Sequence, residues 1–260
     1  MEKVFICLLS ILLLSTGGYM EYIPIVETVA NASVHSMDSN QIPFNLPANV
    51  FSDENGTLYV LDTFNNMIHK IDSYGNVVRF AGNILMLDEH TPLLDSSRFP
   101  MGFILDGYLE DALFNRPVDA VQDANGRIFI VDRSNHAIRV IYTTFANDDG
   151  LESEEGYYVV SVFTFAGGGN AGYANGRGAE AMFYYPSALA LGSCGNLYIA
   201  DTGNNAIRRI DTSGYVTTVA GQAGRHGYRN GIAREALFYH PMGIAVNNMA
   251  QSLLQIQEII

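Results

Sequence analysis

Cysteine is nearly absent from this 260-residue chain, which contains only Cys7 and Cys194. Cys7 lies in an apolar N-terminal segment, and without that segment a single thiol remains, which cannot form an internal disulfide. The chain shows no nucleophile–base–acid arrangement at a recognisable spacing. We therefore interpret Cys194 as a turn residue and not as a nucleophile.

Basic residues are also scarce. The chain has 14 Lys and Arg against 27 Asp and Glu, so its formal net charge is −13. Nucleic-acid binding normally needs a basic face that replaces the counterions around phosphates. The charge therefore argues against nucleic acid and against anionic membrane surfaces as partners. A hydrophobic content of 48% is enough for a sizeable folded core. No nucleotide-binding loop is predicted, because the glycines at 167–169 and 172–178 precede no helix.

Only one long apolar run occurs, and it is too short to cross a bilayer. It comprises 11 residues, Val4 to Leu14, with Lys3 before it and small residues after it. This pattern is typical of a signal peptide, predicted here over residues 1–20. The alternatives are an uncleaved membrane anchor and a buried first strand. A signal peptide would make the protein secreted or lumenal in the secretory pathway, where the sequons at Asn31 and Asn55 are candidate glycosylation sites.

The chain contains a repeat. Pro, an apolar strand, an Asn-Gly or Gly-Asn turn and a second strand ending in Asp occur three times. The copies span residues 47–62, 117–132 and 186–201, and the Asp follows the Pro by 15 residues in each. Fixed spacing inside each copy and variable linkers between copies predict repeated β-modules.

Each copy continues with Asp-x-x-Asn, a strand carrying Arg or His, and a strand ending in Ala-Gly, and a Phe stands three residues before each Pro. The pattern predicts four short strands per unit, as in a β-propeller blade. We expect the Asp side chain to accept backbone N–H groups of the following turn. His69 and His136 are interpreted as blade-surface residues. The residues assigned structural turn roles are Asp62, Asn65, Asp132, Asn135, Asp201 and Asn204.

Three segments resemble the NHL repeat. They are Phe-x-x-Pro, Asn-Leu-Tyr-Ile-Ala-Asp-Thr-Gly-Asn-Asn-Ala-Ile-Arg-Arg-Ile at 196–210, and Val-Thr-Thr-Val-Ala-Gly at 216–221. The resemblance covers Phe44 to Val246 and implies an all-β fold, a β-propeller of four-stranded NHL-type blades within residues 21–250. It also implies an interaction platform more often than an enzyme, although propellers carry many unrelated activities.

The repeat count predicts three complete blades and a partial fourth, which begins at Phe238 and stops after Val246. Residues 26–30 resemble an outermost strand, so we expect them to complete the last blade. The tail at 251–260 does not match the repeat, and we favour truncation of a longer propeller. In the alternative, the tail forms a strand or short helix and the array closes on itself or on another copy. An incomplete ring would expose strand edges and would tend to self-associate.

Two insertions between the predicted strands are rich in acidic residues. One, at 83–108, contains Asp88, Glu89, His90, Asp95 and Asp106. Ca²⁺ takes oxygen ligands, but neither insertion has EF-hand spacing, so we interpret both as solvated charge runs and keep a Ca²⁺ loop as the alternative. The candidates in the second insertion, at 143–156, are Asp148, Asp149, Glu152, Glu154 and Glu155.

The centre of the propeller is the other candidate site. Asn49 and Asp119 each lie two residues after a repeat Pro, and we expect them at the channel mouth on neighbouring blades. Metal-dependent propeller enzymes gather ligands at this place, but the other two copies have Ala188 and Gly243, and two ligands are too few for such a site. No catalytic residue, metal ligand or cofactor is assigned.

The sequence therefore predicts a non-enzymatic interaction module that binds a protein or glycan in the secretory pathway or outside the cell. One alternative is a metal-dependent propeller enzyme resembling the amidating-lyase and lactonase propellers. The other is a fragment of a longer NHL protein.

Overall fold

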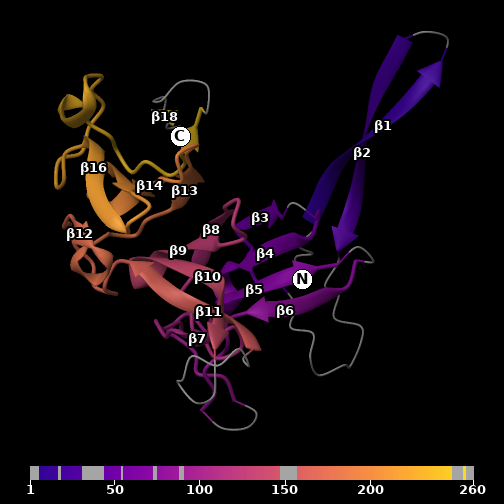
Figure 1. Ribbon diagram of the computed structural model, residues 1–260, viewed down its shortest axis with the longest axis horizontal. Helices are drawn as coiled ribbons and strands as arrows, with labels where there is room; N and C mark the ends of the chain where they lie inside the picture. The colour runs from indigo at the N-terminus through magenta and orange to yellow at the C-terminus, as the bar shows by residue number, and fades with distance from the viewer. Residues whose placement is uncertain are drawn as a thin grey trace.

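The computed structural model describes residues 6–16, 19–30, 44–53, 55–72, 75–87, 91–146, 157–247 and 254–255. The strands of every sheet are antiparallel, and the described helices are single 3-10 turns (Figure 1). None of these helices is long and apolar enough to span a membrane. Two strands, β1 (Ile6–Thr16) and β2 (Tyr19–Ala30), pair with each other as a separate hairpin.

Three sheets form the blades, in which consecutive strands lie side by side. Blade 1 consists of β3 (Asn49–Ser52), β4 (Leu58–Asp62), β5 (Met67–Ile71) and β6 (Val77–Ala81). Blade 2 has β8 (Pro117–Gln122), β9 (Ile128–Asp132), β10 (Ala137–Ala146) and β11 (Tyr157–Ala166). Blade 3 has β13 (Ala188–Leu191), β14 (Leu197–Asp201), β15 (Ala206–Ile210) and β16 (Tyr215–Gly221).

Blades 2 and 3 each gain a fifth strand that the repeat did not predict. The linker before each blade supplies two residues, β7 (Gly107–Tyr108) against β11 and β12 (Gly176–Arg177) against β16. A fourth sheet is described only as β17 (Ala245–Val246) and β18 (Leu254–Gln255), which pair with each other. The tail therefore places a second strand beside the inner strand of the fourth blade.

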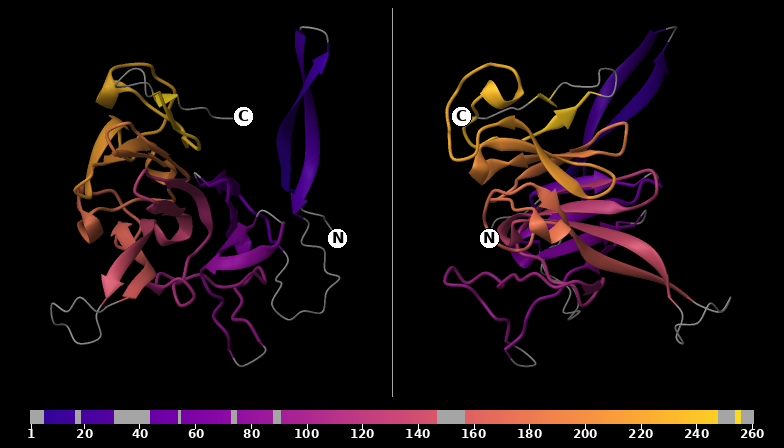
Figure 2. Two further views of the ribbon diagram at one scale, coloured as in Figure 1. Left: turned by 45° about the vertical axis from the view of Figure 1, so that its right-hand side comes forward. Right: turned by 60° about the vertical axis from the view of Figure 1, so that its left-hand side comes forward.

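The innermost strands of successive blades contact one another. β8 lies between β3 and β13, and β17 contacts β13, so the four sheets follow each other in an arc (Figures 1 and 2). This arrangement confirms the predicted β-propeller. The prediction for residues 26–30 is wrong, because they belong to β2 and pair with β1, where Val26 lies opposite Leu9.

The core lies between blades and follows from strand alternation. On β4, Tyr59 and Leu61 face blade 2, where they join a buried cluster with Ile128 and Ile130 of β9. The Phe that stands three residues before the repeat Pro fills the interface between neighbouring blades. Phe183, at the entry to blade 3, is fully buried in the cluster between blades 2 and 3. Burial of such a side chain contributes about 1.5–3 kcal/mol.

The Gly of each Ala-Gly pair is required by this packing. Gly167 has φ +94°, and a Cβ there would lie 2.5 Å from the carbonyl oxygen of His136 and 3.2 Å from the Phe183 ring. Gly82 and Gly221 have the same φ region and the same close neighbours in their own repeats. Glycine therefore permits both the turn and the close approach of the next blade.

The repeat Asp is buried, and its contacts differ from the prediction. Asp201 Oδ1 accepts a 2.8 Å hydrogen bond from the backbone N–H of Tyr184, which lies 17 residues earlier. Its Oδ2 accepts from Asn204 Nδ2 and from the Arg208 guanidinium, both at 2.8 Å. The expected bonds to the following turn are absent from the described caps. The carboxylate instead ties the entry of its blade to the second and third strands.

The surface interpretation of His69 and His136 is also wrong. The His69 side chain is buried, with its Nε2 3.0 Å from Asp62 Oδ2 and its ring edge-on to Phe44, so it stands where blades 2 and 3 have Arg. His136, at φ +52°, accepts a 3.1 Å hydrogen bond at Nδ1 from the backbone N–H of Tyr185 in the next blade. Burial lowers the pKa of His136 below its usual value of 6.5.

Candidate functional site

The predicted channel-mouth residues meet at the innermost strands. Asn49 on β3 donates a side-chain hydrogen bond to Asp119 Oδ1 on β8. The other carboxylate oxygen of Asp119 accepts a 2.8 Å bond from the backbone N–H of Leu189 on β13. Burial raises the pKa of Asp119, and these hydrogen bonds oppose that change. One carboxylate thus joins the inner strands of three blades, which is a structural role.

Beside this junction lies a hollow of about 350 Å³, called the axial hollow here. It sits where the second strand of a blade turns into the third, through the 3-10 helices η1 (Thr63–Asn65) and η2 (Arg133–Asn135). Blades 1, 2 and 3 all contribute to it. Its lining residues are Thr63, Phe64, Arg116, Val118, Arg133, Ser134 and Tyr185.

A hydrogen bond holds the backbone of Arg116 in place, whereas its side chain makes only weak contacts. Its N–H donates to Asn66 Oδ1 at 2.8 Å, which holds it at φ +57° just before Pro117. The guanidinium lies 4.9 Å from the Phe64 ring centroid and 3.5 Å from a carboxylate oxygen of Asp95. The side chain is 41% exposed, and such a surface pair contributes only about 0–1 kcal/mol. A competing anion can therefore displace Asp95.

Arg133 supplies the second cation. Its backbone N–H donates to the carbonyl of Arg116 at 3.3 Å, which brings the two arginines to one wall of the hollow. Within the described part of the chain, its guanidinium makes no hydrogen bond or ion pair. The hydroxyl of Ser134 and the ring of Tyr185 complete the surroundings.

Sequence reasoning missed this hollow, although departures from the repeat mark it. After the repeat Asp, the other copies have Thr63 and Thr202, whose hydroxyls donate to the carbonyls of Pro117 and Pro241 in the next blade. Blade 2 has Arg133 at that position and forgoes this link. Arg116 occupies a position where the other copies have Leu46, Tyr185 and His240, all with positive φ.

The arrangement suits an anion. Two guanidinium groups beside hydroxyls match the geometry of a carboxylate or an oxyanion, which accept bidentate hydrogen bonds. The setting is unusual, because the chain as a whole carries a net charge of −13. A local basic site in an acidic protein attracts a group that the rest of the surface repels.

Several predicted candidates lie elsewhere. Asn55 occupies the exposed turn between β3 and β4, whereas Asn31 and all the acidic-loop candidates lie outside the described residues. In the first insertion, Asp106 accepts hydrogen bonds from Arg139 at 2.7 Å and from Thr164 at 2.9 Å. Asp95 accepts from the backbone N–H groups of Ser97 and Phe99. Across the described residues, no group of three or more His, Cys, Asp or Glu is arranged to hold a metal ion.

The second blade carries the sequence evidence for the family. Residues 114–141, from the Phe at the entry of blade 2 into β10, match the NHL repeat family. This is an NHL-repeat protein. The matched residues comprise β8, β9 and the first part of β10, and they include the buried pair of Asp132 and Arg139. The conformation of these residues recurs in blade 3.

Solved structures share the propeller fold. A structural genomics protein of unknown function from Bacteroides thetaiotaomicron is 20% identical with a TM-score of 0.54, over 86% of this NHL chain and 45% of that chain. A putative phosphatase from the same organism is 16% identical with a TM-score of 0.54, over 89% and 47%. An auxiliary nutrient binding protein, also from that organism, is 20% identical with a TM-score of 0.50, over 75% and 41%. These likenesses show the fold alone.

One curated relative matches in sequence. Protein SUPPRESSOR OF QUENCHING 1, chloroplastic, from Arabidopsis thaliana is 28% identical over 153 residues, which are 59% of this chain and 12% of that protein. The NHL chain therefore spans less than half of the solved structures named above and a small part of the plant protein.

Proposed function

We propose that this NHL-repeat protein is a non-enzymatic interaction module whose axial hollow binds an anionic group of a protein or glycan partner. The observation that carries the proposal is the pairing of Arg116 and Arg133 on one wall of the hollow. The Asp95 contact with Arg116 is a single exposed pair at 3.5 Å, whereas a carboxylate in the hollow would accept hydrogen bonds from both guanidinium groups. A charge-assisted hydrogen bond contributes about 1.5–3 kcal/mol.

The lining supports binding over catalysis. It contains no carboxylate, thiol or imidazole that would act as a base or nucleophile. Its polar groups are guanidinium and hydroxyl groups, which recognise an anion and leave it unchanged. A projecting acidic side chain or an acidic sugar fits a hollow of this size, with Tyr185 as an aromatic wall.

Direct titration tests the proposal. The full chain is titrated with a fluorescein-labelled Glu-rich peptide and, separately, with a glucuronate-containing tetrasaccharide. The matched variants come from the repeat itself, namely Arg133→Thr and Arg116→Leu, which are the residues at these positions in blade 1. Arg225→Gln changes the net charge equally on an exposed linker far from the hollow in sequence.

We expect each hollow variant to weaken binding of at least one probe by about tenfold or more, which corresponds to about 1.4 kcal/mol. Arg225→Gln should leave the affinity nearly unchanged. Equal weakening by all three variants would reduce the effect to net charge, and unchanged binding in Arg133→Thr would refute the assignment of the hollow.

We further propose that residues 1–20 direct the protein into the secretory pathway. The support is the sequence pattern of that segment and the sequon at Asn55, which is exposed on a hairpin turn. Expression of the full chain in secreting eukaryotic cells should place it in the medium or lumen. An endoglycosidase-sensitive mobility shift should become smaller in Asn55→Gln and disappear in the double variant Asn31→Gln, Asn55→Gln. A protein that stays in the cytosol without a glycan would contradict this proposal.

A further inference from the structure

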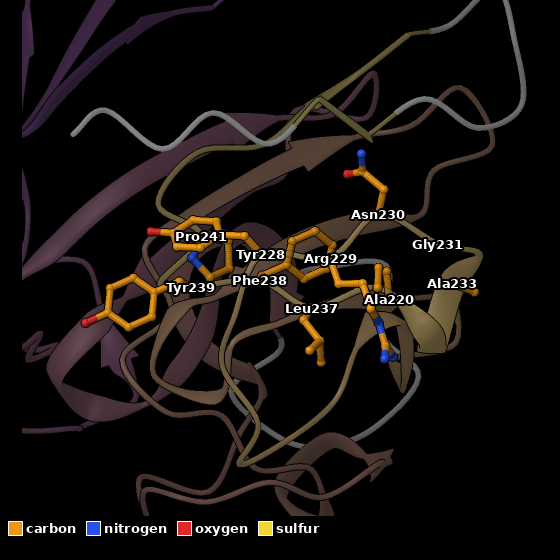
Figure 3. A pocket seen from close by; sticks show the side chains of 11 residues that line it. Ala220, Tyr228, Arg229, Asn230, Gly231, Ala233, Leu237, Phe238, Tyr239 and Pro241 are labelled. Carbon is orange, nitrogen blue, oxygen red and sulfur yellow. The ribbon is translucent and has the colours of Figure 1, made fainter.

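A larger hollow, of about 630 Å³, lies beside blade 3 between Ala220 and the segment Tyr228–Pro241 (Figure 3). The hollow corresponds in position to a site that occurs in each of blades 2 and 3. The equivalent positions in blades 2 and 3 are occupied by buried arginine side chains, so the contacts of those arginines define what the hollow is built to hold.

In blade 3 this site is occupied by the side chain of Arg208. Its guanidinium donates to the backbone carbonyls of Ala174 at 2.6 Å and Met182 at 3.0 Å, and to Asn175 Oδ1 at 2.9 Å. It also lies over the rings of Tyr173 and Phe183, at 4.5 and 5.3 Å from their centroids. The side chain is fully buried.

Arg139 occupies the equivalent site in blade 2. It donates to the carbonyls of Leu105 and Leu113, both at 2.8 Å, and to Asp106 Oδ1 at 2.7 Å. Its guanidinium lies 5.2 Å from the centroid of Phe114. In both blades, the two carbonyls belong to residues that also pair with each other through their backbone N–H groups.

The segment around the large hollow aligns without gaps with the segment that surrounds Arg208. Tyr228 to Pro241 follows Tyr173 to Pro186 at a constant offset of 55 positions. Arg229 and Leu237 pair through their backbone at 3.2 and 3.0 Å, as Ala174 and Met182 do. Tyr228, Asn230 and Phe238 stand where Arg208 finds Tyr173, Asn175 and Phe183, and Figure 3 shows these three side chains at the hollow.

This third site, formed by Tyr228–Asn230 and Leu237–Phe238 and called the guanidinium seat here, receives no arginine from the described residues. The guanidinium of Arg229 itself donates to the carbonyl of Glu235 and not to the seat carbonyls. In blades 2 and 3 the arginine comes from the third strand, β10 or β15. The fourth sheet is described only as β17 and β18, so the far edge of β18 has no described neighbour.

We propose that the guanidinium seat binds an arginine presented by a β-strand of a different protein, not of a second copy of this chain, and that this strand adds to β18 as the third strand of the fourth blade. A carbonyl oxygen accepts two hydrogen bonds, so the seat carbonyls keep capacity beyond their own backbone pair. The Phe238 face supplies a cation–π contact. An edge strand supplies backbone hydrogen bonds to the added strand. The forked geometry of the carbonyl pair selects Arg over Lys.

The chain itself supplies the probes. A peptide with the sequence of residues 204–211, which contains Arg208, is compared with its Arg208→Gln form. A second control is the peptide of residues 65–72, which has the same frame with His69 in place of the arginine. Each labelled peptide is titrated into the full chain and into the variants Tyr228→Ala and Asn230→Ala. Tyr215→Ala, at an exposed tyrosine of β16, is the matched protein control.

We expect the arginine peptide to bind at least tenfold more tightly than either control peptide, and Asn230→Ala and Tyr228→Ala to weaken it by about fivefold or more. Tyr215→Ala should not. The proposal is overturned if the three peptides bind alike. It is also overturned if none binds at about 1 mM, the concentration at which a binding free energy of about 4 kcal/mol is detected. A dimer of the chain that Asn230→Ala dissociates would assign the seat to a second copy, which also overturns it.

Discussion

Substitution of Arg208 by Met tests the buried Asp–Arg pair that the repeat builds into each blade. The guanidinium is fully buried and makes four hydrogen bonds, to two carbonyls, to Asn175 and to Asp201. Met keeps most of the volume but none of the donors. Asp201, which is itself buried, would then be left with Tyr184 and Asn204 as its hydrogen-bond donors.

The expected loss of stability follows from the carboxylate of Asp201, which would remain buried without its cationic partner. Removal of one partner from a buried ion pair costs about 3–5 kcal/mol, which is a large part of the total stability of about 5–15 kcal/mol expected for a domain. Urea denaturation at pH 8, followed by circular dichroism, should show a midpoint lower by about 1–2 M. The double variant Arg208→Met, Asp201→Asn removes the uncompensated charge, so it should be more stable than Arg208→Met alone.

Two results would refute this reasoning. One is a loss of less than about 1 kcal/mol in Arg208→Met, the range of an exposed pair. The other is a double variant no more stable than the single one. Either result would mean that Asp201 is not held as a buried charge by Arg208.

The remaining predictions use the same stability assay. Gly167→Ala should destabilise the protein by about 2 kcal/mol or more, because its Cβ meets the His136 carbonyl at 2.5 Å, whereas Gly126→Ala, at φ +79° in open space, should cost only about 1 kcal/mol. Equal losses would contradict the close approach. Because burial lowers the pKa of His136, the unfolded state binds its proton more readily, so the free energy of unfolding should fall as the pH drops through about 6.5. His136→Asn, the residue that blades 1 and 3 have there, should flatten that part of the pH profile, and an unchanged profile would exclude His136 as its source.

The sequence predicts the blades because the repeat places turn residues at fixed intervals. The turns between the first two strands have positive φ at Gly56, Gly126 and Gly195, as the Asn-Gly pattern indicates. The two-residue strands β7 and β12 were not predictable, because a pair such as Gly107–Tyr108 has no periodicity. Their strand character comes from pairing with β11 and β16.

The buried cations illustrate a second limit. Arg139 and Arg208 lie in the third strands of their blades, and from sequence alone a charged residue is expected to face solvent. Their burial depends on an acid seven residues earlier and on carbonyls more than 25 residues away in sequence. The axial hollow likewise combines Phe64, Arg116 and Tyr185 from three blades. Only the stacking of the blades brings such residues together, so local pattern does not reveal them.

Hydrogen–deuterium exchange with the acidic peptide bound tests most directly the claim that the axial hollow is the binding surface. We predict protection of the amides around Arg116, of η2 and of Tyr185, and we predict that Arg133→Thr abolishes this protection. Protection confined to the outer linkers, or protection that persists in Arg133→Thr, would contradict the account.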